Sequence, residues 1–578
     1  MKRNLALLFW IVMMVFFHTE LNAQAQGWSW AKRVGGTGDD QPKSIVTDAN
    51  GNVYCIGDFE NTVDFDPGPG VVNLTAAVTD IFISKWDSAG NFIWVKQIGG
   101  DDHDYATALG LDPSGNLIAT GMFADTVDFD PGNGVYNLVT TGYALNAFML
   151  KLDSAGNFIW ANRVNFFHNA LRDRSMVISP DGSICITGWM DILPVDMDPG
   201  PGTSLLYTNG LKDAVVAKYS STGNYEWAVN FGGSLQNDAA FLASTNNTLP
   251  GAVYAGGQFF GSFDFDPGAN SFIMTSAGNQ DIYLVSYDAA GTFLWGKRFG
   301  GPGTEYLNSI NTDLNTGDIY LTGAFAGTVD FDPDPLVTYN LVGSSLFSDV
   351  FVVKLDPLGN FIWAKSFGNF DNEEGLFVTL DPLGNVFVGG YFSGVTDFDP
   401  SAATAIDTCS SGYDLYISKF DSYGNFLWVK TAEGVLYEMI TTINIDQALN
   451  IYVGGTFDGA SLLMAPYNLL NAGPDYERDL FIAKIPDVST GIPSINSESS
   501  CYLYPNPAAD FTTLYLPEGK RCYSRVQICD VGGQILKEVN GEFVGRLKLD
   551  VGELKSGVYF VKIASEGDLT VKKLIVLN

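Results

Sequence analysis

The chain has 578 residues, 46% of them hydrophobic and 13% aromatic, which predicts more than one folded core. Residues 26–490 hold 19 basic and 54 acidic residues, a net charge of −35, and so acidic a body argues against binding to nucleic acids or anionic membranes. The six cysteines are too few for a disulfide-dense scaffold, and the three histidines lack the spacing of a metal site.

The first 25 residues have the pattern of a secretory signal peptide. Lys2 and Arg3 form the charged start, residues 5–17 form an apolar run, and Ala23-Gln24-Ala25 offers a small-x-small cleavage motif. The apolar run has 13 residues, fewer than a membrane-spanning helix needs. We therefore expect a cleaved signal peptide, residues 1–25, and a mature chain without a transmembrane segment.

A long repeat occupies residues 26–488. A typical copy contains a hairpin such as LDPSGNLIATG at 111–121, then a strand of the pattern D-[ILAV]-[FYV]-x-x-K, a turn, and a strand that in most copies has the pattern G-N-F-x-W. These are four short alternating strands per copy, with no helical period, which is typical of propeller blades. The second copy of the D-[ILAV]-[FYV]-x-x-K strand begins with Asn146, and the fourth ends in Ser286. The Trp residues recur at intervals of 64 to 68 residues, at Trp30, Trp94, Trp160, Trp227, Trp295, Trp363 and Trp428.

The two ends of the repeat region complement each other. The last copy ends after DLFIAKI at 479–485 without its fourth strand, and the first copy begins with that strand alone, GWSWAKRVGG at 27–36. A ring completed in this way loses its exposed sheet edges. The sequence thus predicts an all-β fold with a seven-bladed β-propeller closed by the N-terminal strand. We expect the Trp side chains to pack between blades.

The repeat resembles a known family. Its D-x-S-G-N turns, Y-x-x-G strands and G-N-F-x-W strands are similar to the SBBP-type bacterial β-propeller repeat over residues 26–488. The resemblance implies the propeller fold. It implies no activity, because the family shares no catalytic residues.

A linker rich in Pro and Ser, residues 489–500, precedes a segment of different rhythm. Short alternating strands with Gly turns over residues 501–578 predict a small β-sandwich. The order of YPNP at 504–507, DVGG at 530–533 and KKLIV at 572–576 resembles the type A C-terminal sorting domain of the type IX secretion system. That resemblance implies recognition by the type IX machinery of Bacteroidetes-like bacteria, and then surface attachment or release. The alternative is a generic Ig-like adhesion domain.

The most distinctive motif is D-x-D-P (DxDP), which six copies carry between their second and third strands, as in VDFDPG at 63–68 and VDMDPG at 195–200. Strand alternation places its two Asp side chains on one side, and paired carboxylates with turn carbonyls can bind calcium, the one cofactor that the sequence suggests. The alternative is structural, because Asp before Pro-Gly often caps a turn. The candidate calcium ligands are Asp64, Asp66, Asp128, Asp130, Asp196, Asp198, Asp264, Asp266, Asp330, Asp332, Asp397 and Asp399.

The sequence assigns no catalytic residues. It has no G-x-S-x-G, H-E-x-x-H or C-x-x-C motif, which favours a protein without enzymatic activity. The motif loops and the acidic connections between blades should emerge on one face, which predicts an acidic binding surface. We therefore expect a secreted or cell-surface binding or adhesion module for an extracellular protein or glycan. The alternatives are a secreted glycan-acting hydrolase or lyase with its site on that face, and a passive structural surface protein.

Overall fold

The computed structural model forms two compact units, Met1–Asp487 and Val488–Asn578. The predicted signal peptide, the predicted linker, and the YPNP and DVGG motifs lie wholly or largely outside the described residues. The structure describes residues 27–486 except 141–144, 168–174, 192–193, 209, 211, 234–240, 245–250, 345, 370, 410 and 474–476, and residues 502–576 except 505–510, 516–521, 530–534, 544–545, 556 and 566–567.

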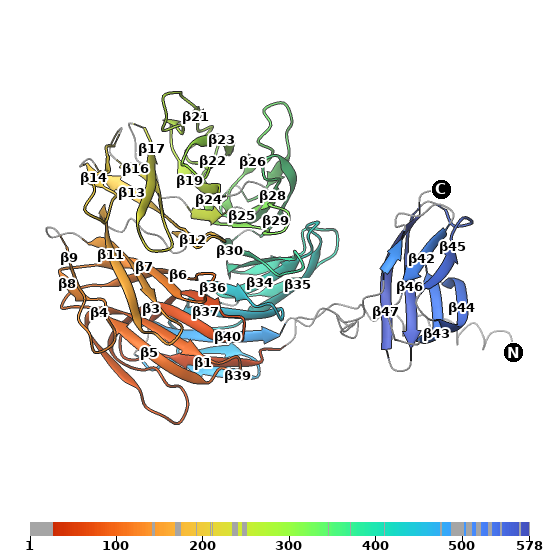
Figure 1. Cartoon of the computed structure of the whole chain (residues 1–578), viewed down its shortest axis with the longest axis horizontal. Coiled ribbons are helices and arrows are strands. Elements are labelled where there is room, and N and C mark those ends of the chain that lie inside the picture. Colours follow the sequence, from red (N-terminus) through yellow and green to blue (C-terminus); the bar gives the residue numbers. More distant parts are fainter. Residues whose placement is uncertain are drawn as a thin grey trace. The chain divides into compact units, whose positions relative to one another are not determined.

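All the named elements of the described residues are strands, which confirms the all-β prediction (Figure 1). Alternating side chains and Gly-Asn turns favour hairpins, and each repeat accordingly forms a four-stranded antiparallel sheet paired in chain order. The first sheet contains β2 (Gln41–Thr47), β3 (Val53–Asp64), β4 (Asn73–Trp86) and β5 (Phe92–Ile98).

Five further sheets repeat this order along the chain. The second contains β6 (Tyr105–Leu111), β7 (Leu117–Phe123), β10 (Asn146–Leu152) and β11 (Phe158–Phe167). The third contains β12 (Met176–Ile178), β13 (Ile184–Asp191), β16 (Lys212–Tyr219) and β17 (Tyr225–Phe231). The fourth contains β18 (Phe241–Ser244), β19 (Val253–Phe259), β22 (Asp281–Tyr287) and β23 (Phe293–Phe299). The fifth contains β24 (Glu305–Thr312), β25 (Ile319–Phe325), β28 (Asp349–Leu355) and β29 (Phe361–Phe367). The sixth contains β30 (Glu374–Leu380), β31 (Val386–Phe392), β34 (Asp414–Phe420) and β35 (Phe426–Ala432).

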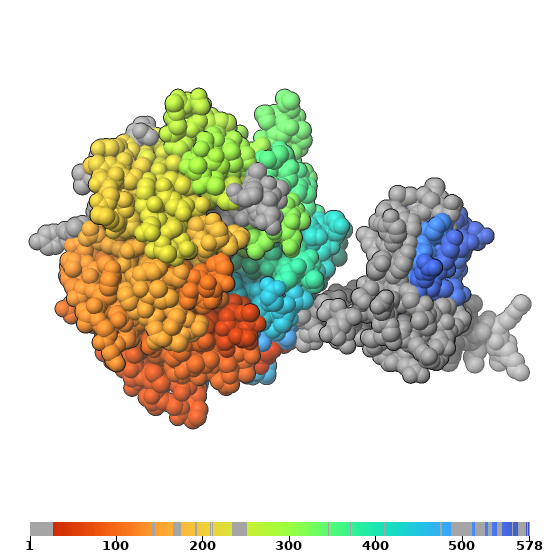
Figure 2. All heavy atoms as spheres, viewed as in Figure 1, coloured from red at the N-terminus to blue at the C-terminus, as the bar shows by residue number. Residues whose placement is uncertain are grey.

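The seventh sheet joins the two ends of the repeat region. It contains β36 (Glu438–Ile445), β37 (Asn450–Phe457), β40 (Asp479–Pro486) and the N-terminal strand β1 (Trp30–Val34). β1 pairs antiparallel with β40, with Trp30 opposite Lys484. The Ile45 amide of β2 donates to Oγ1 of Thr442 in β36 at 3.0 Å, so the first strands of the seventh and first sheets are neighbours. In Figure 2 the red atoms from the start of the described repeats lie beside cyan and light-blue atoms from their last part.

The Trp side chains pack against the following sheet, as predicted. Trp227 of β17 donates from Nε1 to the Ala289 carbonyl at 2.9 Å, in the turn between β22 and β23. A Cβ atom on Gly291 of that turn would lie 2.8 Å from the Trp227 ring. Gly291 has a φ of 81°, so glycine serves here both the turn and the contact.

Short hairpins or strand extensions fill the connections between second and third strands. In the first sheet β3 and β4 simply continue into the connection. The other hairpins are β8 (Thr126–Asp128) with β9 (Asn137–Val139), β14 (Val195–Asp196) with β15 (Leu205–Leu206), β20 (Ser262–Asp264) with β21 (Ile273–Thr275), β26 (Thr328–Asp330) with β27 (Asn340–Val342), β32 (Val395–Asp397) with β33 (Ile406–Thr408), and β38 (Ser461–Met464) with β39 (Tyr467–Leu470).

The C-terminal unit has two sheets around its own core. Leu514 and Leu549 of the smaller sheet and Val526, Val561 and Leu574 of the larger sheet belong to one buried cluster, as expected of a β-sandwich. The smaller sheet contains β41 (Tyr502–Tyr504), β42 (Phe511–Tyr515) and β45 (Arg546–Asp550). The larger contains β43 (Cys522–Cys529), β44 (Ile535–Phe543), β46 (Gly557–Ser565) and β47 (Asp568–Val576).

Candidate functional site

The Asp side chains of the DxDP motifs accept hydrogen bonds from the backbone of their own loops. In the first sheet, Oδ1 of Asp64 accepts hydrogen bonds from the amides of Asp66 at 3.1 Å and Val72 at 2.8 Å, and thereby holds the two sides of the loop together. Oδ1 of Asp66 accepts from the Gly68 amide at 2.8 Å, the bond by which an Asp side chain caps a turn. One oxygen of each carboxylate is thus engaged by the loop backbone.

The same pattern recurs in the other five motifs. The first Asp accepts from the amide two residues later and from a second amide eight or nine residues later, and the second Asp accepts from the amide two residues after itself. Within the described residues, no group of three or more His, Cys, Asp or Glu side chains is placed to hold a metal ion. Calcium binding at these pairs stays a prediction. The further first residues are Asp128, Asp196, Asp264, Asp330 and Asp397, and the second are Asp130, Asp198, Asp266, Asp332 and Asp399.

The motif loops meet the connections between sheets, as the topology of the repeat predicts. Isolated antiparallel bridges join Gly35 to Asp64, Gly232 to Asp264 and Gly300 to Asp330. Each bridge links the connection that enters a sheet to the motif loop of that sheet. The two kinds of connection therefore lie at the same ends of the strands.

A second set of acidic residues lies in the connections between sheets, which the sequence assigned to an acidic binding surface, but the structure buries their side chains. Each follows the Gly-Gly connection, or its equivalent, by a fixed distance and turns inward, so its carboxylate caps the connection. The Gly36 amide donates to Asp40 at 2.7 Å and the Gly100 amide to Asp104 at 2.7 Å. The repeated acid four residues after the second glycine was the available signal. The set consists of Asp40, Asp104, Glu305, Glu373 and Glu438, all with fully buried side chains.

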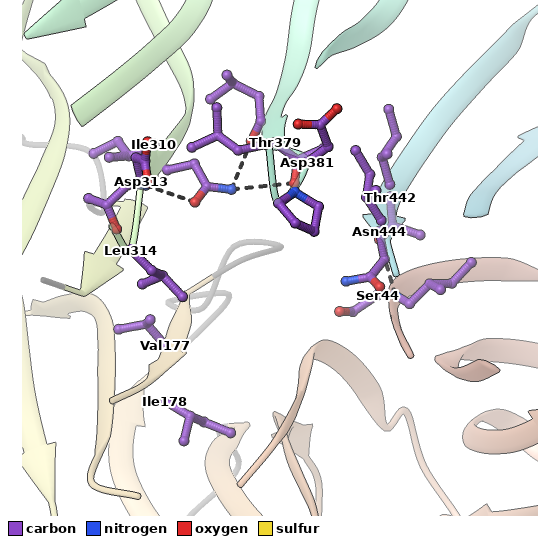
Figure 3. Close-up of a pocket in the computed structure, with 18 of the residues that line it drawn as sticks. Ser44, Val177, Ile178, Ile310, Asp313, Leu314, Thr379, Asp381, Thr442 and Asn444 are labelled. Carbon is purple, nitrogen blue, oxygen red and sulfur yellow. Dashed lines mark hydrogen bonds between the residues drawn. The ribbon is translucent and has the colours of Figure 1, made fainter. Parts of the chain in front are cut away.

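A cavity of about 710 Å³ lies among the first strands of six sheets. Figure 3 shows Ser44, Val177, Ile310, Thr379 and Asn444 placed around it. Its described lining combines aliphatic side chains with amides, hydroxyls and the carboxylates of Asp313 and Asp381, and it includes no Lys, Arg or His. Such a lining offers a ligand apolar contact, neutral hydrogen-bonding groups and negative charge.

The hairpin turns at one end of the fifth and sixth sheets carry large apolar side chains into solvent. Leu314 is 62% exposed, Leu358 56%, Leu383 67% and Tyr423 75%. We call these four residues the apolar turn cluster. Small or polar residues occupy the corresponding positions of the other described turns, namely Ala49-Asn50, Ser88-Ala89, Pro113-Ser114, Ser154-Ala155, Pro180-Asp181, Ser221-Thr222, Ala289-Ala290 and Gln447-Ala448.

Two lysines form polar contacts with the turns of the apolar turn cluster. Nζ of Lys354 lies 2.9 Å from Asp318 in the first turn of the fifth sheet and donates to the Ser422 carbonyl at 3.4 Å, in the turn that carries Tyr423. Nζ of Lys419 lies 3.4 Å from Asp381, beside Leu383. Leu314 also lines the cavity. The exposed side chains thus belong to adjoining turns beside the cavity.

Two segments of the chain match known families. Residues 502–577 match the Secretion system C-terminal sorting domain, and residues 29–58 match the Beta-propeller repeat. Both resemblances are confirmed. The type IX sorting domain implies a secreted or cell-surface protein that is recognised by the secretion machinery. Among the described residues, no helix is long and apolar enough to cross a membrane.

Distant similarities cover longer parts of the chain. An uncharacterized WD repeat-containing protein L264 of Acanthamoeba polyphaga mimivirus is 25% identical over 542 residues, with 79% of this chain and 38% of that protein covered. The regulatory protein FlaEY of Caulobacter vibrioides is 26% identical over 248 residues, with 41% of this chain and 24% of that protein covered. The chain therefore spans well under half the length of these relatives. The crystal structure of polysaccharide lyase Uly1 aligns with 80% of this chain and all of its own at 10% identity and a TM-score of 0.40.

Proposed function

We propose that this chain is an exported binding protein whose propeller captures a protein segment carrying apolar and basic side chains. The apolar turn cluster is the observation that carries the proposal. Its four side chains are more than half exposed, and among the described turns such side chains occur at these positions only in the fifth and sixth sheets. Exposed apolar groups gathered in this way on a soluble protein are typical of interaction surfaces.

Charge supports a basic partner. Residues 26–490 carry a net charge of −35, which attracts cationic partners and speeds their association. Of the lysines beside the cluster, Lys354 and Lys419 form ion pairs with Asp318 and Asp381. The side chains of Lys297 and Lys365 lie against the turn glycines Gly359 and Gly424. Aliphatic contact at the turns, together with a long-range attraction for positive charge, fits a segment with both kinds of side chain.

The turn surface lies at the opposite ends of the strands from the DxDP loops. A binding surface on the acidic loop face was the expectation from sequence. The described loops of that face use one oxygen of each carboxylate in their own backbone bonds. The hairpins of these loops also expose apolar side chains, such as Val135 at 75% and Leu336 at 92%. We favour the turn cluster because its side chains lie in adjoining turns beside the cavity.

The test compares three proteins on a peptide array graded in apolar and basic content. In the first variant, Leu358, Leu383 and Tyr423 are replaced by Ser, and in the matched control Ala89, Ala155 and Ala290 are replaced by Ser. We expect the wild type and the control to prefer peptides rich in both Leu and Lys, with binding at least about tenfold weaker in the first variant, a loss of about 1.4 kcal/mol. Added salt should weaken binding further.

Two results would contradict the proposal. One is equal peptide binding by the wild type and the cluster variant. The other is binding to a glycan array, unaffected by the cluster substitutions, without binding to any peptide. The second result would favour a glycan-acting or glycan-binding protein instead.

A further inference from the structure

Where consecutive sheets meet, each contributes one buried acidic residue. Asp349 begins β28 of the fifth sheet, and Glu373 immediately precedes β30 of the sixth sheet. The Glu373 amide donates to the Ser348 carbonyl at 2.9 Å, which fixes the two acidic residues next to each other. We call such a pair a junction pair.

Four other junctions repeat this backbone bond. The amide of the acidic residue that opens one sheet donates to the residue just before an Asp in the third strand of the preceding sheet, over distances of 2.8 to 3.0 Å. The recurrence shows that the pairing belongs to the repeat and not to a single loop. The further junction pairs are Asp479 with Asp40, Asp80 with Asp104, Asp281 with Glu305, and Asp414 with Glu438.

Each junction pair is removed from water, and each of the five includes a carboxylate or carboxyl oxygen that lacks a described partner. Both side chains of every pair belong to residues that are at least nine-tenths buried. The buried oxygens without a hydrogen-bond partner among the described residues are Oδ1 of Asp349, Oδ1 of Asp80, Oδ1 of Asp479, Oε1 of Glu305 and Oε2 of Glu438. A buried acceptor left in this state is costly unless a donor reaches it.

Glycine backbone closes one side of the junction. A Cβ atom added at Gly368 would lie 2.7 Å from Oδ1 of Asp349, and one at Gly99 would lie 2.5 Å from Oδ1 of Asp80. These oxygens therefore lie directly against the connection between the sheets. The Gly-Gly pattern of the connections leaves room for the carboxyl groups and for no further side chain.

The charges that face the Asp349–Glu373 pair do not neutralise it. Oε2 of Glu373 accepts from the Asn369 amide at 3.0 Å, and Oε1 accepts from Oγ1 of Thr396 at 3.2 Å. Oδ2 of Asp349 accepts from the Ser344 amide at 3.3 Å. The other titratable groups near Glu373 are Asp371 and the buried phenol of Tyr416. No Lys or Arg of the described residues forms an ion pair with either acid, whereas Arg33 and Arg298 pair with Asp479 and Asp281.

We propose that in the three junction pairs without an arginine among the described residues, Asp349 with Glu373, Asp80 with Asp104 and Asp414 with Glu438, the two carboxyl groups share one proton. This proton bonds one acid to the free oxygen of its neighbour and joins consecutive sheets. Two carboxylates held together out of water cannot both ionise readily, and a proton supplies the donor that the free oxygen lacks. Burial raises the pKa of Glu373 to about 8 and that of Asp349 to about 6. It likewise raises the pKa of Asp40 to about 8 and of Asp104, Glu305 and Glu438 to about 7.

The sign of the pH effect follows from these shifts. The folded chain keeps a proton on each of these three pairs up to about neutral pH, whereas the unfolded chain loses it near the ordinary Asp and Glu values of about 4. Unfolding then releases protons, so stability is greatest below about pH 4 to 5 for these groups and falls as pH rises toward 8. The contacts between sheets at these junctions are therefore stabilised only while the shared proton is bound.

The experiment measures the melting temperature and the infrared carboxyl bands of the purified protein from about pH 5 to about pH 9. The Glu373→Gln variant carries an amide that can donate to Asp349 at every pH. We expect it to match the wild type at the acid end and to melt at least about 2 °C higher at the alkaline end. The Asp349→Asn variant offers a second, independent replacement, and Asp101→Asn, at an exposed position, is the control.

The infrared spectrum provides the readout that stability alone cannot. At neutral pH the wild type should show the carbonyl band of protonated carboxyl groups, and Glu373→Gln should lose part of it. Absence of this band at neutral pH, or an identical pH slope in the wild type and both junction variants, would overturn the proposal. So would calcium that restores the alkaline stability of the wild type and not of Glu373→Gln, because a cation would then occupy the pair in place of the proton.

Discussion

Single side chains in this protein act mainly through the backbone of turns. Oδ1 of Asp64 accepts two amide bonds across its loop, and Oδ1 of Asp87 accepts the amides of Ala89 and Asn91, both at 2.9 Å. These hydrogen bonds require an oxygen acceptor on a side chain as short as that of Asp, and they do not require a negative charge. In each candidate calcium ligand, at least one carboxylate oxygen therefore already accepts hydrogen bonds from the backbone of its own loop.

The first prediction separates this turn role from charge. Asp64→Ala removes both backbone bonds and should lower the free energy of unfolding by about 1–2 kcal/mol, because two amides lose their acceptor. Asp64→Asn keeps an oxygen in place and should cost much less. Chemical denaturation in the presence of a chelator measures both variants. Equal losses in the two would show that the negative charge, and not the acceptor, matters.

The second prediction concerns calcium at the six DxDP pairs. If they bind it, the melting temperature should rise with the logarithm of calcium concentration above the dissociation constant, and magnesium should do less because it holds its waters in a stricter shell. The variant with both Asp64→Asn and Asp66→Asn should lose one site in calorimetric titration. Equal responses to calcium, magnesium and matched sodium chloride would leave only turn capping and screening.

Among the elements, the outer strand of each sheet is held by the next sheet. Trp227 reaches from β17 to the turn after β22, and Trp363 reaches from β29 to the Ser422 carbonyl at 3.2 Å. Because each contact requires a glycine without a side chain beneath the indole, turn and strand depend on each other. Packing between sheets therefore depends on two positions of the repeat, the Trp of the fourth strand and the Gly of the turn that it contacts.

The third prediction tests this contact. Gly291→Ala should destabilise the propeller by about 1–3 kcal/mol, since alanine is strained at a φ of 81° and its Cβ would meet the Trp227 ring. Trp227→Ala should cost about 2–4 kcal/mol, with the lower part of that range favoured by its partial exposure. In the double variant the clash is absent, so the two losses should not add. Additive losses, measured by thermal or chemical denaturation, would mean that the two residues do not act together.

For the whole molecule, β1 and the C-terminal unit have different tasks. β1 completes the seventh sheet by pairing with β40, and Arg33 lies 2.8 Å from the buried Asp479. The C-terminal unit has a core of its own, in residues that match a sorting domain. Stability of the repeats should thus depend on the first segment, and export on the last.

The fourth prediction is that deletion of residues 27–34 sharply lowers the melting temperature or causes aggregation. The deletion exposes the edge of β40 and leaves Asp479 buried without its cation. Size-exclusion chromatography and a thermal melt give the result. A deletion variant that stays monomeric and melts at the wild-type temperature would refute closure by the N-terminal strand.

The fifth prediction is that removal of residues 491–578 leaves a folded propeller that stays inside the cell envelope. The two units form separate compact bodies, so the loss of one should not unfold the other. Cell fractionation and a melt of the retained protein measure both parts. Undiminished surface or medium levels of the truncated chain would contradict the role of the tail in export.

The sequence by itself determined the all-β class, the strand order within each repeat, the contact of the Trp side chains with the next sheet, and the nature of the tail. These features depend on local periodicity, on turn chemistry and on repetition, all of which a single chain displays. Only the tertiary structure decided which acids are buried. Glu373 and Asp371 look alike in an acidic run, yet the side chain of Glu373 is fully buried at a junction with Asp349. The apolar turn cluster was hidden for the same reason, because Leu358 and Leu383 are ordinary hydrophobic residues until the fold leaves them exposed. Burial is a property of neighbours brought together across the chain, and no local pattern contains it.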